Sequence, residues 1–200
     1  MTTTQKKIIL ASNTARRKEI LTNLGICFMV MTNANCEEKT VQTEPFAIVK
    51  ALAQRKAESV FEMLNAQDKD SLIISADTLV FKDGAPIGKP QDEAHAFEIL
   101  KALSGTHHHV CTGYTILDAA SGKLVNGCED TLVYFRHLSD DFIRAYIDTG
   151  EPMDKAGAYG IQDKGSMMVS RIEGDYFNVV GLPVSRLLWD LKEKFGFHIF

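Results

Sequence analysis

The chain has 200 residues, of which 45% are hydrophobic and 24% charged, a composition typical of a soluble globular enzyme. This length fits one domain, which can have a lobe on each side of a cleft, so we expect a single domain over residues 1–200. A net charge of −4 argues against nucleic acid as a partner, and the lack of any apolar run near 18 residues argues against a membrane span.

The predicted elements alternate between strands and helices along the chain. Strands are expected over residues 7–11, 28–31, 72–81, 110–117, 124–135 and 166–172. Helices are expected over about 15–24, 43–64 (capped by Thr43), 92–103, 140–148 and 183–194, and the glycine-rich stretch 155–165 is expected to be irregular. This order, which combines strand–helix units with long hairpins, predicts an α/β domain with a mixed β-sheet.

The cysteines and the first residues indicate a cytoplasmic protein. The four cysteines form no C-x-x-C pair and have no histidines at zinc-site spacing. The opening residues, MTTTQKK, are followed by too short an apolar stretch for a signal peptide. A metal site is not expected at the run His107-His108-His109 either, because only the first and third would share a strand face.

Asp77 is the first candidate for chemistry because it lies inside the apolar run 72–81. An unpaired buried carboxylate costs several kcal/mol, so its side chain needs a partner: a metal, a basic side chain or a water molecule that it activates. The alternative is a purely structural role, as a turn cap or in a pair with an arginine.

A second candidate site follows the first strand, at the start of the first helix. Free N–H groups and the helix dipole attract anions there, and the hydroxyls of Ser12 and Thr14 with the guanidinium groups of Arg16 and Arg17 could hold a phosphate. The alternative is a solvated helix start in which Arg17 pairs with a nearby glutamate.

Four further residues could complete a nucleotide site. Glu38, in a pair of acids after a strand, could bind Mg²⁺, and Lys56, on the apolar face of a helix, could meet an anion. Lys89 lies between a glycine and a proline, and Gln162, in the glycine-rich stretch, can both donate to and accept from a base edge. Each could instead be an ordinary surface residue. Together they suit a nucleotide polyphosphate that is cut by water with a divalent metal.

These stretches resemble the Maf family of nucleoside triphosphate pyrophosphatases. The matching motifs are IILAS at 8–12, RRKEIL at 16–21, SADT at 75–78, GKP at 88–90, KAGAYGIQ at 155–162 and NVVGLP at 178–183. The resemblance implies a fold related to inosine triphosphate pyrophosphatases, with a long mixed sheet and two lobes around a cleft. It also implies hydrolysis of a nucleoside triphosphate to the monophosphate and pyrophosphate with Mg²⁺, or Mn²⁺ or Co²⁺, in a homodimer.

The same resemblance implies a role for each candidate residue. Asp77 is the proton acceptor and, with Glu38, a metal-linked carboxylate. The residues implied to contact phosphate are Ser12, Arg17, Lys56 and Lys89, and those implied to set base preference are Arg16, Thr78 and Gln162.

The base-preference residues match the branch of the family that acts on dTTP and UTP, with modified pyrimidine nucleotides as further candidate substrates. The 7-methyl-GTP branch usually has a tryptophan before the arginine pair and lacks the run AYGIQ. One departure is Thr14-Ala15 where the family usually has Ser-Pro; since Thr14 can still cap, we expect the helix to start at the same place. The expected function is house-cleaning of nucleotide pools.

Three alternatives remain open at this point. The chain could be a nucleotide-binding regulator of cell division that hydrolyses nothing. It could also be a phosphatase that removes only the terminal phosphate, or a pyrophosphatase of the 7-methyl-GTP type.

Overall fold

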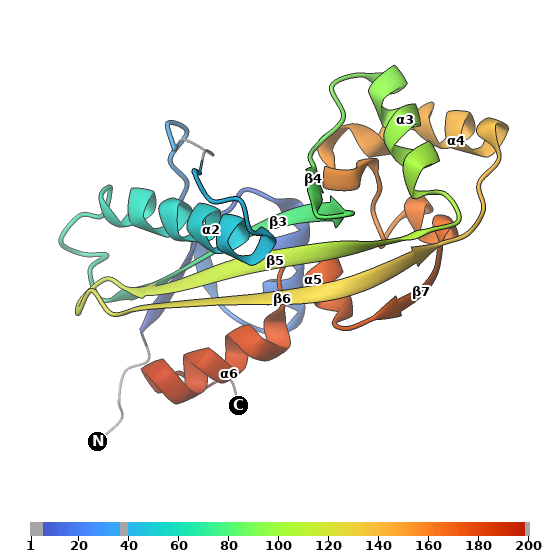
Figure 1. Ribbon diagram of the computed structural model, residues 1–200. Helices are drawn as coiled ribbons and strands as arrows, with labels where there is room; N and C mark the ends of the chain where they lie inside the picture. The colour runs from blue at the N-terminus through green and yellow to red at the C-terminus, as the bar shows by residue number, and fades with distance from the viewer. Residues whose placement is uncertain (1–5, 37–39, 199–200) are drawn as a thin grey trace. The chain divides into compact units, whose positions relative to one another are not determined.

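The computed structural model describes residues 6–36 and 40–198 (Figure 1). Its strands are β1 (Lys7–Leu10), β2 (Phe28–Val30), β3 (Ser71–Lys82), β4 (Ala85–Ile87), β5 (His107–Asp118), β6 (Leu124–Phe135) and β7 (Val169–Glu173). Its α-helices are α1 (Ala15–Asn23), α2 (Pro45–Phe61), α3 (Glu93–Leu103), α4 (Asp140–Ile147), α5 (Tyr176–Val180) and α6 (Val184–Phe195). None of the helices within these residues is long and apolar enough to cross a membrane.

The strands form one mixed sheet in the order β2-β1-β3-β5-β6-β7, with β4 paired to β3. β1 lies parallel to both β2 and β3, whereas β4 is antiparallel to β3 and β7 is antiparallel to β6. The predicted fold class, α/β with a mixed sheet, is therefore confirmed.

The chain divides into two compact units. The first unit comprises residues 1–77, 112–128 and 181–200, and the second comprises 78–111 and 129–180. Strands β3, β5 and β6 each contribute residues to both units, and β3 passes from the first to the second between Asp77 and Thr78.

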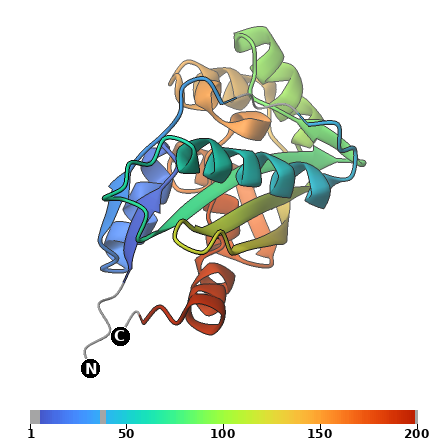
Figure 2. The ribbon, with the colours of Figure 1, turned by 90° about the vertical axis from the view of Figure 1, so that its left-hand side faces the viewer.

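In the first unit, helices α2 and α6 lie on opposite faces of the sheet (Figures 1 and 2). Two successive residues of β5 contact these two helices, because neighbouring side chains on a strand point to opposite faces of the sheet. A Cβ atom on Gly113 would lie 2.4 Å from the backbone of Val49 in α2, so this helix packs directly on β5. Tyr114, the next residue, is fully buried and donates its hydroxyl hydrogen to Asp190 of α6 at 2.5 Å. With both faces covered, three of the four residues of β1 and the first seven of β3 are buried, as expected of parallel strands inside a sheet.

In the second unit, a separate apolar core joins the strand segments to α3, α4 and the segment that follows α4. Its fully buried members include Leu100 and Leu103 of α3, Val133 of β6, Ile143 of α4, and Ala158. Ala158 comes from the glycine-rich stretch, so that stretch is anchored in the core and not only at the surface.

Two expected elements differ from the structure, and one helix in the structure was not expected. Thr43 was the expected cap of the second helix, but α2 begins at Pro45 after Glu44, because a proline is favoured in the first turn, and it ends at Phe61 instead of about residue 64. The strand expected over 166–172 begins only at Val169, because residues 164–168 form a 3₁₀ helix. Helix α5 was not predicted, since five residues are too few to show a helical period.

Candidate functional site

The carboxylate of Asp77 pairs with the ammonium group of Lys56 in the first unit. Lys56 Nζ lies 2.5 Å from Asp77 Oδ1, and the two side chains are only 18% and 12% exposed. The expectation that Asp77 needs a partner is therefore confirmed, and the partner is a basic side chain. Oδ2 makes no hydrogen bond with any residue that the structure describes.

The docking of α2 on β3 accounts for this pair. Ser75 and Asp77 lie on the same face of β3 because side chains alternate along a strand. Ser75 donates its hydroxyl hydrogen to the carbonyl oxygen of Ala53 in α2 at 2.6 Å. Lys56 follows Ala53 by three residues and therefore lies one helical turn further along the same side of α2. The contact at Ser75 thus sets the offset that brings Lys56 to Asp77.

The segment after β1 holds Ser12 and Arg17 in fixed positions. Both side chains are buried, at 6% and 7% exposure. Ser12 Oγ accepts hydrogen bonds from Arg17 Nη1 at 3.1 Å and from the backbone N–H of Thr14 at 3.3 Å, while Arg17 Nε donates to the carbonyl oxygen of Gly181 at 2.8 Å. A hydroxyl and a carbonyl oxygen are therefore two of the partners of Arg17, and the alternative of a glutamate partner stays open.

The departure at Thr14-Ala15 does not move the helix. α1 begins at Ala15 with Thr14 as its N-cap, as predicted, although Thr14 makes no side-chain capping bond. Arg16 is half-buried and makes no hydrogen bond with the described residues.

Parallel pairing of β1 and β3 places this segment at the same end of the sheet as Asp77. Leu10 is paired with Ile74, and the backbone N–H of Ala11 donates to the carbonyl oxygen of Ile74 at 2.7 Å. Ser12 then follows the carboxyl end of β1 while β3 continues to Asp77. Ligands of open α/β sheets bind at the carboxyl ends of parallel strands, so the position of this group suits a binding site.

The second unit brings Thr78, Lys89 and the glycine-rich stretch into one neighbourhood. Gly157 connects them: its N–H donates to the carbonyl oxygen of Gly88 at 3.1 Å, and a Cβ atom on it would lie 2.8 Å from Val80 Cγ2. Gly157 also has a positive φ of 72°, which favours glycine. Val80 shares a strand face with Thr78, and exposed Lys89 follows Gly88 directly.

Tyr159, in the glycine-rich stretch, packs in the core. Its hydroxyl lies 2.8 Å from His108 Nε2, and its ring meets Phe135 edge-on at a centroid distance of 4.7 Å. Burial, helped by the charges of Lys82 and the flanking histidines, lowers the pKa of His108 to about 3. His107 and His109 point to the exposed side of β5, as the strand alternation predicts.

Glu38 falls outside the residues that the structure describes, so its predicted metal role stays a prediction. Within residues 6–36 and 40–198 no group of three or more histidine, cysteine, aspartate or glutamate side chains could hold a metal ion. A divalent ion at Asp77 would therefore need ligands from elsewhere, such as Glu38 or the phosphates of a nucleotide. Magnesium is commonly bound in this way, by one or two carboxylates plus substrate phosphates.

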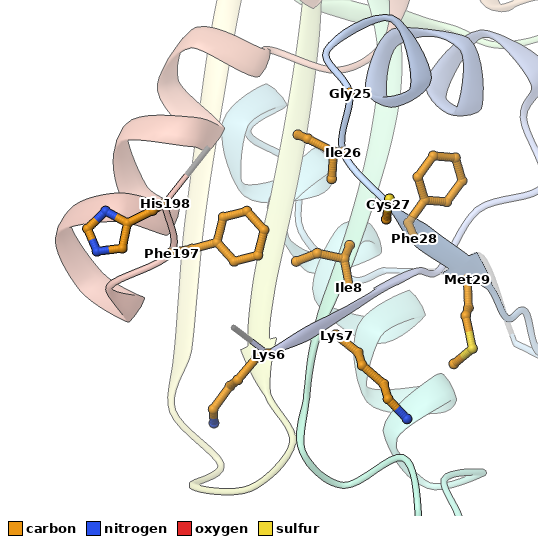
Figure 3. A pocket seen from close by; sticks show the side chains of 10 residues that line it. All are labelled: Lys6, Lys7, Ile8, Gly25, Ile26, Cys27, Phe28, Met29, Phe197 and His198. Carbon is orange, nitrogen blue, oxygen red and sulfur yellow. The ribbon is translucent and has the colours of Figure 1, made fainter. Parts of the chain in front are cut away.

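The first unit also contains a pocket of about 450 Å³ (Figure 3). It is lined by Ile8, Ile26, Phe28 and Phe197, among others, with Lys6 and Lys7 on one side. Lys6 and Lys7 lie at the amino end of β1, whereas Ser12 follows its carboxyl end. None of the predicted site residues lines this pocket, so we do not assign the site to it.

Sequence reasoning missed Tyr146 and Glu151, which hold the glycine-rich stretch. Glu151 accepts hydrogen bonds from Tyr146, Lys164 and Gly165. Neither residue belongs to a motif that stands out in the sequence. The sequence indicated only that they lie on either side of Gly150, close to the end of a predicted helix.

Comparison with known proteins gives a consistent result over the whole chain. The family model described as Maf-like protein matches residues 7–194. A dTTP/UTP pyrophosphatase of Alkaliphilus oremlandii is 48% identical over 196 residues, which cover 97% of this chain and 99% of the relative. Those of Alkaliphilus metalliredigens and Pelotomaculum thermopropionicum are 48% and 43% identical, each over 194 residues, 97% of this chain and 99% of the relative.

A solved structure supports the fold. The Staphylococcus aureus Ham1 protein superposes with a TM-score of 0.51 at 13% identity and covers 94% of this chain and 100% of its own. At this identity the likeness concerns the fold alone, and it agrees with the expected mixed-sheet architecture.

Proposed function

Because this chain belongs to the family of Maf-like proteins, we propose that it is a nucleoside triphosphate pyrophosphatase that hydrolyses dTTP and UTP to the monophosphate and pyrophosphate. Relatives named dTTP/UTP pyrophosphatase share 43–48% of its residues over nearly their whole length, which supports both the reaction and a house-cleaning role in nucleotide pools. The observation within the structure that carries the proposal is the Asp77–Lys56 pair, with one carboxylate oxygen left to accept a proton.

Asp77 acts in this proposal as the general base. Its Oδ2 takes a proton from the water that attacks the α-phosphorus, while Oδ1 stays bonded to Lys56, which fixes the orientation of the carboxylate. The bond between the α-phosphorus and the bridging oxygen breaks, and pyrophosphate leaves. Its charge is balanced by Lys56, Arg17 and Lys89, while the Ser12 hydroxyl contacts phosphate.

A divalent cation, Mg²⁺ with Mn²⁺ or Co²⁺ as substitutes, completes the proposal. Asp77 and Glu38 are the residues proposed to hold it. When bound it neutralises charge on the phosphate oxygens. The donor set is consistent with such an ion, because Asp77 is a hard oxygen ligand that contacts Lys56, one of the proposed phosphate contacts.

The base is proposed to be read by Arg16, Thr78 and Gln162. Arg16 and Gln162 make no hydrogen bonds with the described residues, so both side chains are available to a ligand. A free amide suits a uracil or thymine edge because it offers both a donor and an acceptor. Modified pyrimidine nucleotides remain further candidate substrates. We also propose a homodimer located in the cytoplasm, with no nucleic-acid or membrane partner.

A pyrophosphate-release assay with product identification tests the proposal. With Mg²⁺ and dTTP or UTP, we expect the monophosphate and pyrophosphate in equal amounts. A nucleotide-binding regulator would release nothing, and a terminal phosphatase would give the diphosphate and orthophosphate. Faster turnover of 7-methyl-GTP than of dTTP and UTP would contradict the proposed substrate class.

A further inference from the structure

The loop of residues 160–165, which carries Gln162, is held by side chains that come before it in the chain. We call this segment the Gln162 loop. Three of its backbone N–H groups, those of Gly160, Lys164 and Gly165, donate to side chains and not to other backbone groups. The conformation of the loop therefore depends on the side chains that accept these bonds.

Glu151 accepts two of these bonds with its two carboxylate oxygens. Oε2 accepts from the N–H of Lys164 at 3.2 Å, and Oε1 accepts from the N–H of Gly165 at 3.1 Å. Oε1 also accepts from the hydroxyl of Tyr146 at 2.9 Å. Both oxygens of the carboxylate accept hydrogen bonds, so its orientation is fixed.

Tyr146 holds the other end of the loop. Its hydroxyl accepts from the N–H of Gly160 at 3.3 Å while donating to Glu151, so one pair of side chains holds both ends. Burial and the carboxylate of Glu151 raise the pKa of Tyr146, which keeps the hydroxyl protonated and able to donate. The packing is also close, since a Cβ atom on Gly165 would lie 2.8 Å from this hydroxyl oxygen.

Gln162 lies between the two anchored ends. Its side chain is half-buried and forms no hydrogen bond with the described residues, so its placement is set by the backbone of the loop. We infer that Glu151 is a positioning residue that, together with Tyr146, sets the base selectivity of the enzyme by fixing the Gln162 loop. This inference rests on the proposed function, in which Gln162 reads the base.

The substitution Glu151→Gln tests the inference. An amide has one acceptor oxygen, so one of the two loop N–H groups would face an NH₂ group and lose its bond. We expect the ratio of kcat/KM for UTP over that for CTP to fall about five- to tenfold, the range that a weakened hydrogen bond to the base would produce. The change should appear in KM, with kcat for UTP within about twofold of wild type, because Glu151 contacts no reacting atom.

Tyr159→Phe is the matched control. It removes a hydroxyl next to the Gln162 loop, but that hydroxyl bonds His108 in the core and none of the loop N–H groups. We expect a lower melting temperature and an unchanged UTP/CTP ratio. A ratio that falls equally in both variants would mean that any loss of packing near the loop alters selectivity, which would overturn the inference.

Backbone hydrogen exchange reports on the loop independently of activity. At least one of the N–H groups of Lys164 and Gly165 should exchange at least tenfold faster in Glu151→Gln than in wild type, and both should exchange at the wild-type rate in Tyr159→Phe. If Glu151→Gln does not fold, Tyr146→Phe carries the same test, since it removes the acceptor for Gly160 and keeps the ring.

The outcomes separate the two proposals. A wild-type protein that releases no pyrophosphate from UTP overturns the proposed function, and the selectivity role with it. An active wild-type protein whose Glu151→Gln variant keeps both the UTP/CTP ratio and slow exchange overturns this inference alone.

Discussion

At the scale of single residues, the Asp77–Lys56 pair places two opposite charges where water has little access. Removing water makes each charge costly without the other, so each side chain holds its partner in place. A carboxylate fixed in this way loses little entropy when it accepts a proton from an oriented water molecule.

Replacing Asp77 by Asn keeps the shape of the side chain and removes the proposed base. We expect kcat for dTTP and UTP to fall about 10²- to 10⁴-fold, the range for loss of a general base. Steady-state kinetics with Mg²⁺ measure this. Asp118→Asn is the matched control, because Asp118 is also a buried aspartate that a lysine, Lys6, contacts at 2.5 Å. Full turnover by Asp77→Asn would rule out Asp77 as the base.

His108 should make folding stability depend on pH. Its pKa is about 3 in the folded protein and near 6.5 when unfolded, so between these values the unfolded chain binds the extra proton. Stability is fully present above about pH 6.5 and falls by about 1.4 kcal/mol per pH unit as the pH drops toward 3. Urea unfolding at pH 7 and pH 5 measures the slope.

Other groups also titrate in this range, so the His108 contribution is the difference between variants. His108→Phe should flatten the dependence, whereas His107→Phe, at an exposed position of β5, should leave it unchanged. Equal slopes in wild type and His108→Phe would show that His108 is not the group responsible.

At the scale of elements, α2 is the helix on which the site depends, because its docking on β3 and β5 places Lys56. Gly113→Ala should disturb that docking, since the added Cβ would overlap the backbone of Val49. We expect a loss of about 1–3 kcal/mol in unfolding free energy, typical of overpacking, and a lower kcat through displacement of Lys56.

Urea unfolding and steady-state kinetics measure the two effects of Gly113→Ala. Gly88→Ala is the stability control, because nothing lies within 4 Å of a Cβ there. If the unfolding free energy and kcat of Gly113→Ala both equal those of wild type, α2 can shift without consequence for the site.

The sequence allowed most elements to be predicted, but not the pairs between them. Asp77 inside an apolar strand and Lys56 on an apolar helix face each indicated a need for an opposite charge. That they satisfy each other depends on the offset between α2 and β3, which the contacts at Gly113 and Ser75 set. Similarly, the glycines of residues 155–165 predicted an irregular stretch, whereas Glu151, which holds it, bonds residues 13 and 14 positions away. Hydrogen bonds between residues this far apart in the sequence leave no helical or strand periodicity from which they could be predicted.

At the scale of the whole molecule, the described residues contain no complete metal cage. We therefore expect Mg²⁺ alone to raise the melting temperature little, and Mg²⁺ with UTP to raise it strongly. At a hundredfold excess over Kd, a ligand that binds only the folded state adds about 2.7 kcal/mol of stability. Thermal unfolding under the three conditions measures this, with EDTA expected to abolish pyrophosphate release. An equal shift with Mg²⁺ alone would indicate a site built entirely from protein ligands.

The division of the chain into units has a consequence for synthesis. Helix α6, which covers one face of the first unit through Tyr114, follows the whole of the second unit in the sequence. A nascent chain therefore cannot cover this face of the first unit before the second unit has been synthesised, and until then the face is open to chaperones.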